Sequence, residues 1–139
     1  MIILDTNVVS EVMRPVPSPQ VLDWIDTVPS NELFTTAITV AEIYYGVEVL
    51  TKSKRRDALL AASDAIFDGD FRDRVLAFNA GAARVFSQIS ARRRATGRPI
   101  SQSDAQIAAI VQLHGGTLAT HNTRDFEGCG VRLIDPWTT

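Results

Sequence analysis

Four acidic residues of this sequence are candidates for a shared chemical site: Asp5, Glu42, Asp104 and Asp125. Asp5 directly follows the apolar run 2–4, which has the length and composition of a buried strand. Clustered carboxylates repel one another, and a hard divalent cation relieves that repulsion while it satisfies their oxygens. These residue types therefore predict an all-oxygen site that suits Mg²⁺ or Mn²⁺.

Alternating strands and helices are predicted to position these acids. Short apolar runs predict five strands, at residues 2–4, 32–35, 75–78, 117–119 and 131–134. Apolar periodicity and capping residues predict helices at about 8–13, 19–28, 39–50, 54–67, 80–95 and 103–114. This alternation predicts an α/β fold with a parallel sheet covered on both faces. Ligands of such sheets gather beyond the carboxyl ends of the strands, where Asp5 is expected.

Three of the acids also have a simpler structural explanation. Thr39 and Glu42 fit the S/T-x-x-E capping box that closes the start of a helix. Asp104 follows Ser101 at the same spacing, and acids in a first helical turn also favour the helix dipole. Asp5 is different, because a charged group directly after an apolar strand is costly unless something pairs with it. Asp5 is therefore the strongest candidate for a functional role.

Polar and basic residues near these positions leave two interpretations open. Thr6 and Asn7 follow Asp5 and can hydrogen-bond a carboxylate or a phosphate, or merely form a turn. The net charge is −2, yet basic residues cluster at 52–56 and at 92–98. Such runs either bind nucleic-acid phosphates or form solvated surfaces, and the sequence does not separate the two.

Length and composition restrict the class of protein. A chain of 139 residues suits one domain, and no stretch approaches the roughly 18 apolar residues that a membrane helix needs. Cys129 is the single cysteine, which excludes an intramolecular disulfide and fits a reducing compartment. We therefore expect a cytoplasmic protein that does not enter a membrane.

Four ordered segments resemble PIN-domain toxins of the VapC/FitB type: 3–11, 38–43, 103–109 and 118–126. The closing Asp135-Pro136-Trp137 is similar as well, so the resemblance spans nearly the whole chain. It implies one PIN domain over residues 1–139, with a PIN-like three-layer α/β fold around a parallel sheet of about five strands.

The resemblance also implies an activity and a set of site residues. The activity is that of a Mg²⁺- or Mn²⁺-dependent endoribonuclease acting on RNA, the toxin of a type II toxin–antitoxin system. A small antitoxin with a DNA-binding domain would restrain it, and the toxin would form a homodimer. The first three acids of the family fall on Asp5, Glu42 and Asp104, and its hydroxyl residue on Thr6. The fourth contact stays open between Asp125 and Asn122.

Two other functions remain as alternatives. One is a catalytically weak PIN-like domain that acts as a binding partner or regulator, because the fourth acid departs from the family pattern. The other is a phosphoacceptor switch of the receiver kind, with Asp5 as the acceptor.

Overall fold

The computed structural model describes all 139 residues and contains one five-stranded parallel sheet. The strands are β1 (Ile2–Leu4), β2 (Leu33–Thr36), β3 (Val75–Leu76), β4 (Thr117–Ala119) and β5 (Arg132–Ile134). Their order across the sheet is β3-β2-β1-β4-β5. In this register Ile3 of β1 lies opposite Phe34 of β2 and Leu118 of β4.

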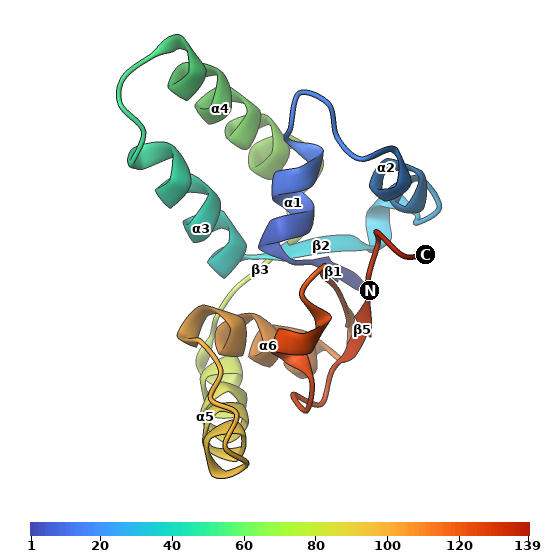
Figure 1. Cartoon of the computed structure of the whole chain (residues 1–139), viewed down its shortest axis with the longest axis vertical. Helices are drawn as coiled ribbons and strands as arrows, with labels where there is room; N and C mark the ends of the chain where they lie inside the picture. The colour runs from blue at the N-terminus through green and yellow to red at the C-terminus, as the bar shows by residue number, and fades with distance from the viewer.

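Helices cover both faces of the sheet and complete three layers (Figure 1). One layer contains α1 (Thr6–Val12), α2 (Pro19–Asp26), α3 (Ala37–Glu48) and α4 (Lys54–Asp64). The opposite layer contains α5 (Ala80–Ala95) and α6 (Gln102–His114). Shorter helical segments are η1 (Ser30–Glu32), η2 (Ala65–Asp70) and η3 (Thr123–Phe126). The prediction of an α/β fold with a covered parallel sheet is confirmed.

The two cores follow from the alternation of side chains along the central strand. Ile3 belongs to the buried cluster that includes Ile89 of α5 and Ile107 of α6. Leu4, the next residue, belongs to the cluster on the other face with Val8 of α1. Successive strand residues point to opposite faces, and fully burying such a side chain contributes about 1.5–3 kcal/mol. The apolar run before Asp5 therefore anchors both layers.

The order of the strands creates a crevice at the carboxyl end of β1. The chain passes from β1 to β2 and β3 on one side, and then crosses to β4 and β5 on the other. Segments leaving neighbouring strands diverge at such a switch point, and ligands of open sheets bind there. Three segments meet at this edge: Asp5 after β1, α3 after β2, and Thr120 after β4.

Local capping residues set several helix ends, but the start of α3 differs from the prediction. Asn79 caps α5 by accepting from the Ala82 N–H, and α6 ends at Gly115 with a left-handed φ of 64°. The prediction that Thr39 opens α3 is wrong. Thr36 is the N-cap, and its side chain accepts from the Thr39 N–H. The last strand residue of β2 thus serves as the cap, so the helix starts earlier than periodicity alone indicates.

Smaller differences concern boundaries. The helix expected from residue 8 begins at Thr6, because Asp5 itself is its N-cap. The third strand is limited to Val75–Leu76, and α4 passes into the π-helical turn η2 after Asp64. None of the helices combines the length and the apolar composition that crossing a bilayer requires.

Candidate active site

Asp5 lies at the centre of the carboxyl edge and is only 4% exposed. Its Oδ1 accepts from the Thr6 backbone N–H at 2.8 Å. Its Oδ2 accepts from the Thr120 hydroxyl at 2.8 Å and from the Asn7 side-chain amide at 3.2 Å. All three donors are neutral, so the carboxylate is held firmly in one orientation without a compensating positive charge.

Burial raises the pKa of Asp5 from its ordinary 3.8 to about 6. The loss of hydration is the largest cause, and the charges of Asp104 and Glu42 add to it. The hydrogen bonds from Thr120 and Thr6 act in the opposite direction, because they favour the charged form. Asp5 is thus an acid whose negative charge is destabilised by its surroundings.

Glu42 lies in the second turn of α3 and is held by a hydroxyl group of α1. The Thr6 hydroxyl donates to Glu42 Oε1 at 2.7 Å. The Thr39 hydroxyl is 3.0 Å from that of Thr6, and it donates here because the single Thr6 proton is already engaged by Glu42. The capping interpretation of Glu42 is wrong, since Thr36 closes the start of α3 and the Glu42 carboxylate points to α1 instead.

Asp104 lies in the first turn of α6 and is half-buried. Its backbone N–H donates to the side chain of Ser101, the N-cap, which confirms the local capping pattern at this helix. Desolvation raises the pKa of Asp104, and the charges of Asp125 and Glu42 raise it further. The carboxylate thus shares the field of the other acids even though its backbone has an ordinary capping role.

Asp125 and Asn122 belong less closely to this group. Both are exposed, as Glu42 is, and Asp125 raises the pKa of Asp104 but is not among the causes of the shift at Asp5. The side chains of both residues lack a hydrogen-bond partner, while the Asn122 backbone N–H donates to the Thr120 hydroxyl. The structure therefore brings Asp5, Glu42 and Asp104 into mutual electrostatic range, and it places Asp125 near Asp104 rather than near Asp5. The Asn122 backbone reaches Asp5 only through the Thr120 hydroxyl.

The donor set fits a hard divalent cation in an open site. None of the four acids takes part in the ion pairs of the structure, so their repulsion has no protein counter-charge in direct contact. No three Asp, Glu, His or Cys side chains lie close enough together to enclose an ion by themselves. Mg²⁺ usually retains several waters and takes only one or two carboxylates directly, so an incomplete protein shell of oxygens is compatible with it.

Thr120 is a site residue that the sequence analysis missed. It is completely buried, and its hydroxyl contacts Asp5, Asn7 and the Asn122 backbone, which ties the end of β4 to the end of β1. Thr39 was missed in the same way, because it was taken for a helix cap. A buried threonine carries no sequence pattern of its own; the only available indication for Thr120 was its position directly after the fourth strand.

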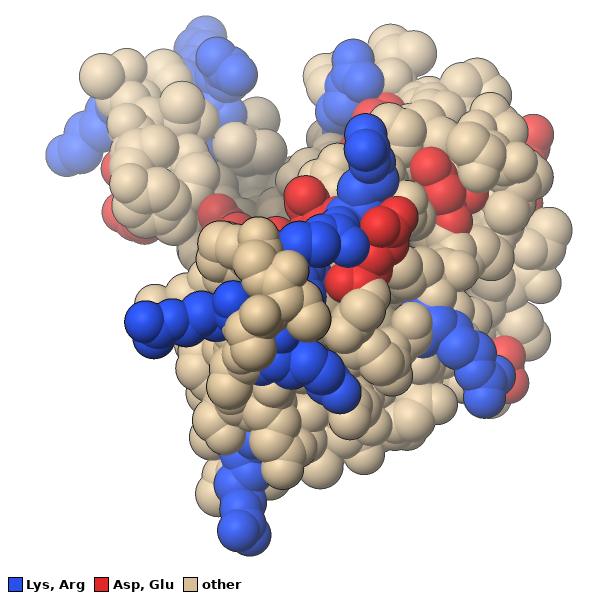
Figure 2. Space-filling view, turned by 60° about the horizontal axis from the view of Figure 1, so that its bottom comes forward, with Lys and Arg blue, Asp and Glu red and all other residues tan.

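Acidic and basic side chains mix on one face of the molecule, and a groove reaches the site. Figure 2 shows acidic side chains near the centre of one face, with Lys and Arg side chains projecting around them. A groove of about 550 Å³ lies between α1, α3 and α4 and reaches the site at Thr6 and Glu42. Its walls include apolar side chains and two arginines: Met13, Ile43, Leu50, Leu59, Arg14 and Arg55.

Arg93, a member of the basic run 92–98, is not available to bind phosphate. Arg93 is only 6% exposed, and its guanidinium donates to the backbone carbonyls of Arg98, Asp125 and Glu127. It therefore fastens the segment around η3 to the end of α5. Arg92, Arg94 and Arg98 remain exposed beside it.

Comparison with known proteins places this geometry in a family. Similar curated proteins include the plasmid stability protein StbB of Pseudomonas syringae pv. tomato, which is 39% identical over 99% of both chains. The toxin FitB of Neisseria gonorrhoeae is 35% identical over 99% of both chains. A VapC ribonuclease of Sinorhizobium fredii is 36% identical over 99% of this chain and 98% of its own.

Solved structures agree with the sequence relatives. A chain of the FitAB complex bound to a DNA fragment superposes with a TM-score of 0.91 at 35% identity, over 99% of this chain and 96% of that one. The PIN domain family matches residues 2–129, the span that contains every acid of the site. The chain belongs to the PIN domain family.

Proposed function

We propose that this protein is a metal-dependent endoribonuclease that hydrolyses RNA phosphodiester bonds, and that it is the toxin of a type II toxin–antitoxin pair. The observation that carries the proposal is the buried Asp5 carboxylate, which meets the charges of Glu42 and Asp104 without a basic partner. Relatives named as a toxin and as a VapC ribonuclease favour an enzyme over the binding-only alternative. The burial of Asp5 also argues against its phosphorylation.

Asp5, Glu42 and Asp104 would hold Mg²⁺ or Mn²⁺, one or two of them directly and the rest through its retained waters, with Asp125 or Asn122 supplying the fourth contact. When bound, the metal would lower the pKa of a water molecule and offset negative charge on the phosphate. The chain's own part is orientation. Neutral donors fix both Asp5 oxygens and the Thr6 hydroxyl fixes Glu42, as outer hydrogen bonds commonly do for metal ligands.

The RNA would be held by basic side chains around the acids. Exposed Arg92 and Arg94 lie in the last turn of α5, and exposed Arg98 follows that helix and donates to the Arg124 carbonyl of η3, the segment that carries Asp125. Each phosphate neutralised by such a side chain makes binding more sensitive to salt. Arg93 takes no part, because carbonyl groups already occupy its buried guanidinium.

A small antitoxin with a DNA-binding domain would restrain the enzyme through the groove between α1, α3 and α4. The structure of the FitAB complex on DNA, which contains a chain similar to this one, supports such a partner. The groove offers apolar contacts along its length and ends at Glu42, so a bound segment would cover the approach to the acids. A partner that inserts an amphipathic segment there would block RNA without changing the fold.

A larger side chain on the wall of this groove is expected to weaken antitoxin binding without affecting catalysis. Gly46 lies on the groove wall inside α3, and a Cβ added there meets nothing within 4 Å. Gly46→Leu should therefore weaken antitoxin binding by at least about tenfold, which calorimetry would measure. Replacing a helical glycine should also stabilise α3 by roughly 1 kcal/mol.

The matched control is Gly46→Ala, which gives the same helical benefit with little added volume. It should bind the antitoxin as the wild type does, and both variants should still cleave RNA. Undiminished antitoxin binding by a folded Gly46→Leu protein would place the partner on another surface.

A homodimer is the expected assembly of the enzyme. Tyr45 of α3 and Val49, its C-cap residue, are 70% and 61% exposed, and their spacing of four residues places them on the same face as an exposed apolar pair. In the dimer, a second copy of the chain would cover these two side chains. Light scattering should therefore give the mass of a dimer, and a monomer mass at micromolar concentration would contradict this assembly.

Replacing Glu42 with glutamine tests the proposed enzyme directly. Glutamine can still accept from the Thr6 hydroxyl, so the contact between α1 and α3 is retained while the negative charge is lost. We expect cleavage of a fluorescently labelled RNA in Mn²⁺ to fall by about ten- to a hundredfold. Added EDTA should abolish the wild-type activity.

Glu48→Gln is the matched control on the same helix. Glu48 pairs with Arg56 at the surface, 67% exposed, and surface pairs contribute little to stability. This variant should cleave at the wild-type rate. Full activity of a folded Glu42→Gln protein would exclude Glu42 from the active site. Wild-type cleavage that persists in EDTA would exclude a metal-dependent mechanism.

A further inference from the structure

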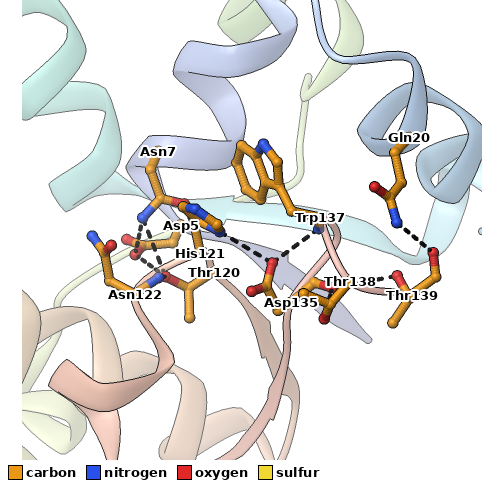
Figure 3. A network of polar contacts seen from close by, with 10 residues as sticks. All are labelled: Asp5, Asn7, Gln20, Thr120, His121, Asn122, Asp135, Trp137, Thr138 and Thr139. Carbon is orange, nitrogen blue, oxygen red and sulfur yellow. Dashed lines mark hydrogen bonds and ion pairs between the residues drawn. The ribbon is translucent and has the colours of Figure 1, made fainter.

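Two residues near the C-terminus, Asp135 and Trp137, contact His121 beside the candidate active site. We call this group of three residues the tail clasp. His121 follows Thr120 at the end of β4, and Asp135 directly follows β5. The His121 Nδ1 is 3.3 Å from Asp135 Oδ1, and the rings of His121 and Trp137 are 4.4 Å apart at an angle of 38°. Figure 3 shows this arrangement beside Asn7 and Asp5.

The tail clasp fixes His121 although its side chain is 53% exposed. The backbone N–H of His121 donates to Asn7 Oδ1 at 3.1 Å, and Asn7 in turn donates to Asp5. Asp135 is itself fixed, because it accepts from the Trp137 backbone N–H at 2.9 Å. His121 is therefore constrained in three ways: Asn7 holds its backbone, Asp135 holds one ring nitrogen, and Trp137 packs against its ring. Fixing an exposed side chain costs conformational entropy, so contacts to a ligand gain from finding it already ordered.

Asp135 also determines which ring nitrogen of His121 is available. An ionised carboxylate can only accept, so Nδ1 carries a proton in both the neutral and the charged imidazole. The other nitrogen, Nε2, has no hydrogen-bond partner in the structure. The tail clasp thus presents Nε2 at an exposed position, and only Asn7 separates the backbone of His121 from the central carboxylate.

We propose that His121 contacts the RNA substrate, with Nε2 hydrogen-bonded to the ribose 2′-hydroxyl of a nucleotide beside the scissile phosphate. This inference rests on the proposed ribonuclease function. A 2′-hydroxyl can donate and accept, so it can pair with Nε2 whether or not that nitrogen carries a proton. A phosphate oxygen can only accept, and DNA lacks the hydroxyl. The contact would therefore contribute to the preference of this site for RNA.

The test combines a His121 variant with single 2′-deoxy substitutions in the RNA. A labelled RNA is cleaved in Mn²⁺ under single-turnover conditions, and its cut is mapped. Matched copies then carry one 2′-deoxy nucleotide at each position flanking that cut. His121→Asn keeps an amide donor for Asp135 and lacks the outer nitrogen. The matched control is His114→Asn, at the exposed end of α6 away from the clasp.

With the wild type, we expect one flanking 2′-deoxy substitution to slow cleavage by about three- to tenfold, the effect of one hydrogen bond. His121→Asn should slow cleavage of the all-ribose RNA by a similar factor and show no further loss at that position. His114→Asn should retain both the wild-type rate and the full 2′-deoxy penalty.

Three results would overturn the inference. The first is a wild type whose cleavage rate is the same for every flanking 2′-deoxy substitution, a result that needs no variant to observe. The second is a His121→Asn protein that slows cleavage of all substrates equally and keeps the full 2′-deoxy penalty, which would indicate a structural or phosphate contact. Finally, a wild type that cleaves no RNA would refute the proposed function itself, an outcome distinct from cleavage without 2′-hydroxyl dependence.

Discussion

Replacing Asp5 with asparagine is expected to slow RNA cleavage by about a hundred- to a thousandfold, the scale on which loss of one active-site electrostatic group acts. Asparagine preserves the size of the side chain and its acceptor for the Thr6 N–H, but it removes the central negative charge. Asp5 is the most buried of the four acids and is held by three donors. Initial rates on a labelled RNA in Mn²⁺ would measure the effect.

Two further variants make this result interpretable. Asp104→Asn should lose activity in the same way, because Asp104 is, after Asp5, the least exposed acid of the site. Asp23→Asn changes an exposed carboxylate of α2, so its activity should equal that of the wild type. Full activity of a folded Asp5→Asn protein would refute the assigned role of this residue.

The same Asp5→Asn substitution is expected to stabilise the metal-free protein by about 2 kcal/mol at pH 8. The pKa of Asp5 is about 6 in the folded state and near 3.8 when unfolded, a difference that corresponds to roughly 3 kcal/mol. The asparagine amide group faces the donors of both Asn7 and Thr120, and that mismatch offsets about 1 kcal/mol of the gain.

The sign of the pH dependence follows from proton binding. Between about pH 4 and pH 6 the folded protein keeps a proton on Asp5 that the unfolded chain has released. This contribution to stability is therefore complete below about pH 4 and is lost as the pH rises through about 6. The raised pKa of Asp104 acts in the same direction.

Urea unfolding in EDTA, followed by tryptophan fluorescence, would measure these differences across the pH range. The stabilisation by Asp5→Asn should disappear at about pH 4, and Asp23→Asn should show none at any pH. Mg²⁺ at a hundred times its Kd should stabilise the wild type by about 3 kcal/mol and the variant far less. A variant no more stable than the wild type at pH 8 would show that burial does not destabilise the charged form of Asp5.

Such a cost in stability is what a binding site for a cation entails. The chain holds a carboxylate where water is scarce and like charges are near, so the free site is less stable than a neutral one would be. A bound divalent ion would make the charged form of Asp5 favourable, because its positive charge attracts the carboxylates that otherwise repel one another. Activity and stability are therefore expected to change in opposite directions at Asp5.

The sequence by itself determined the elements and the strongest member of the site. Strand β1 was predictable because three apolar residues end abruptly in an acid, and caps such as Asn79 act through bonds between near neighbours in the chain. The α/β class followed from the alternation of short apolar runs with helical periodicity. Asp5 was identified for the same local reason, since its position after a buried strand leaves few structural explanations.

Only the tertiary structure decided how the other residues act. Thr39 and Glu42 fit a local capping pattern, yet Glu42 bonds to Thr6, which is 36 positions away in the sequence. Thr120 reaches Asp5 across 115 positions because β4 pairs directly with β1, a strand order that no local pattern specifies. Arg93 belongs to a basic run, but packing buried it while its neighbours stayed exposed. Short-range patterns fix helices and strands, whereas hydrogen bonds between distant segments depend on the sheet order and therefore exist only in the folded chain.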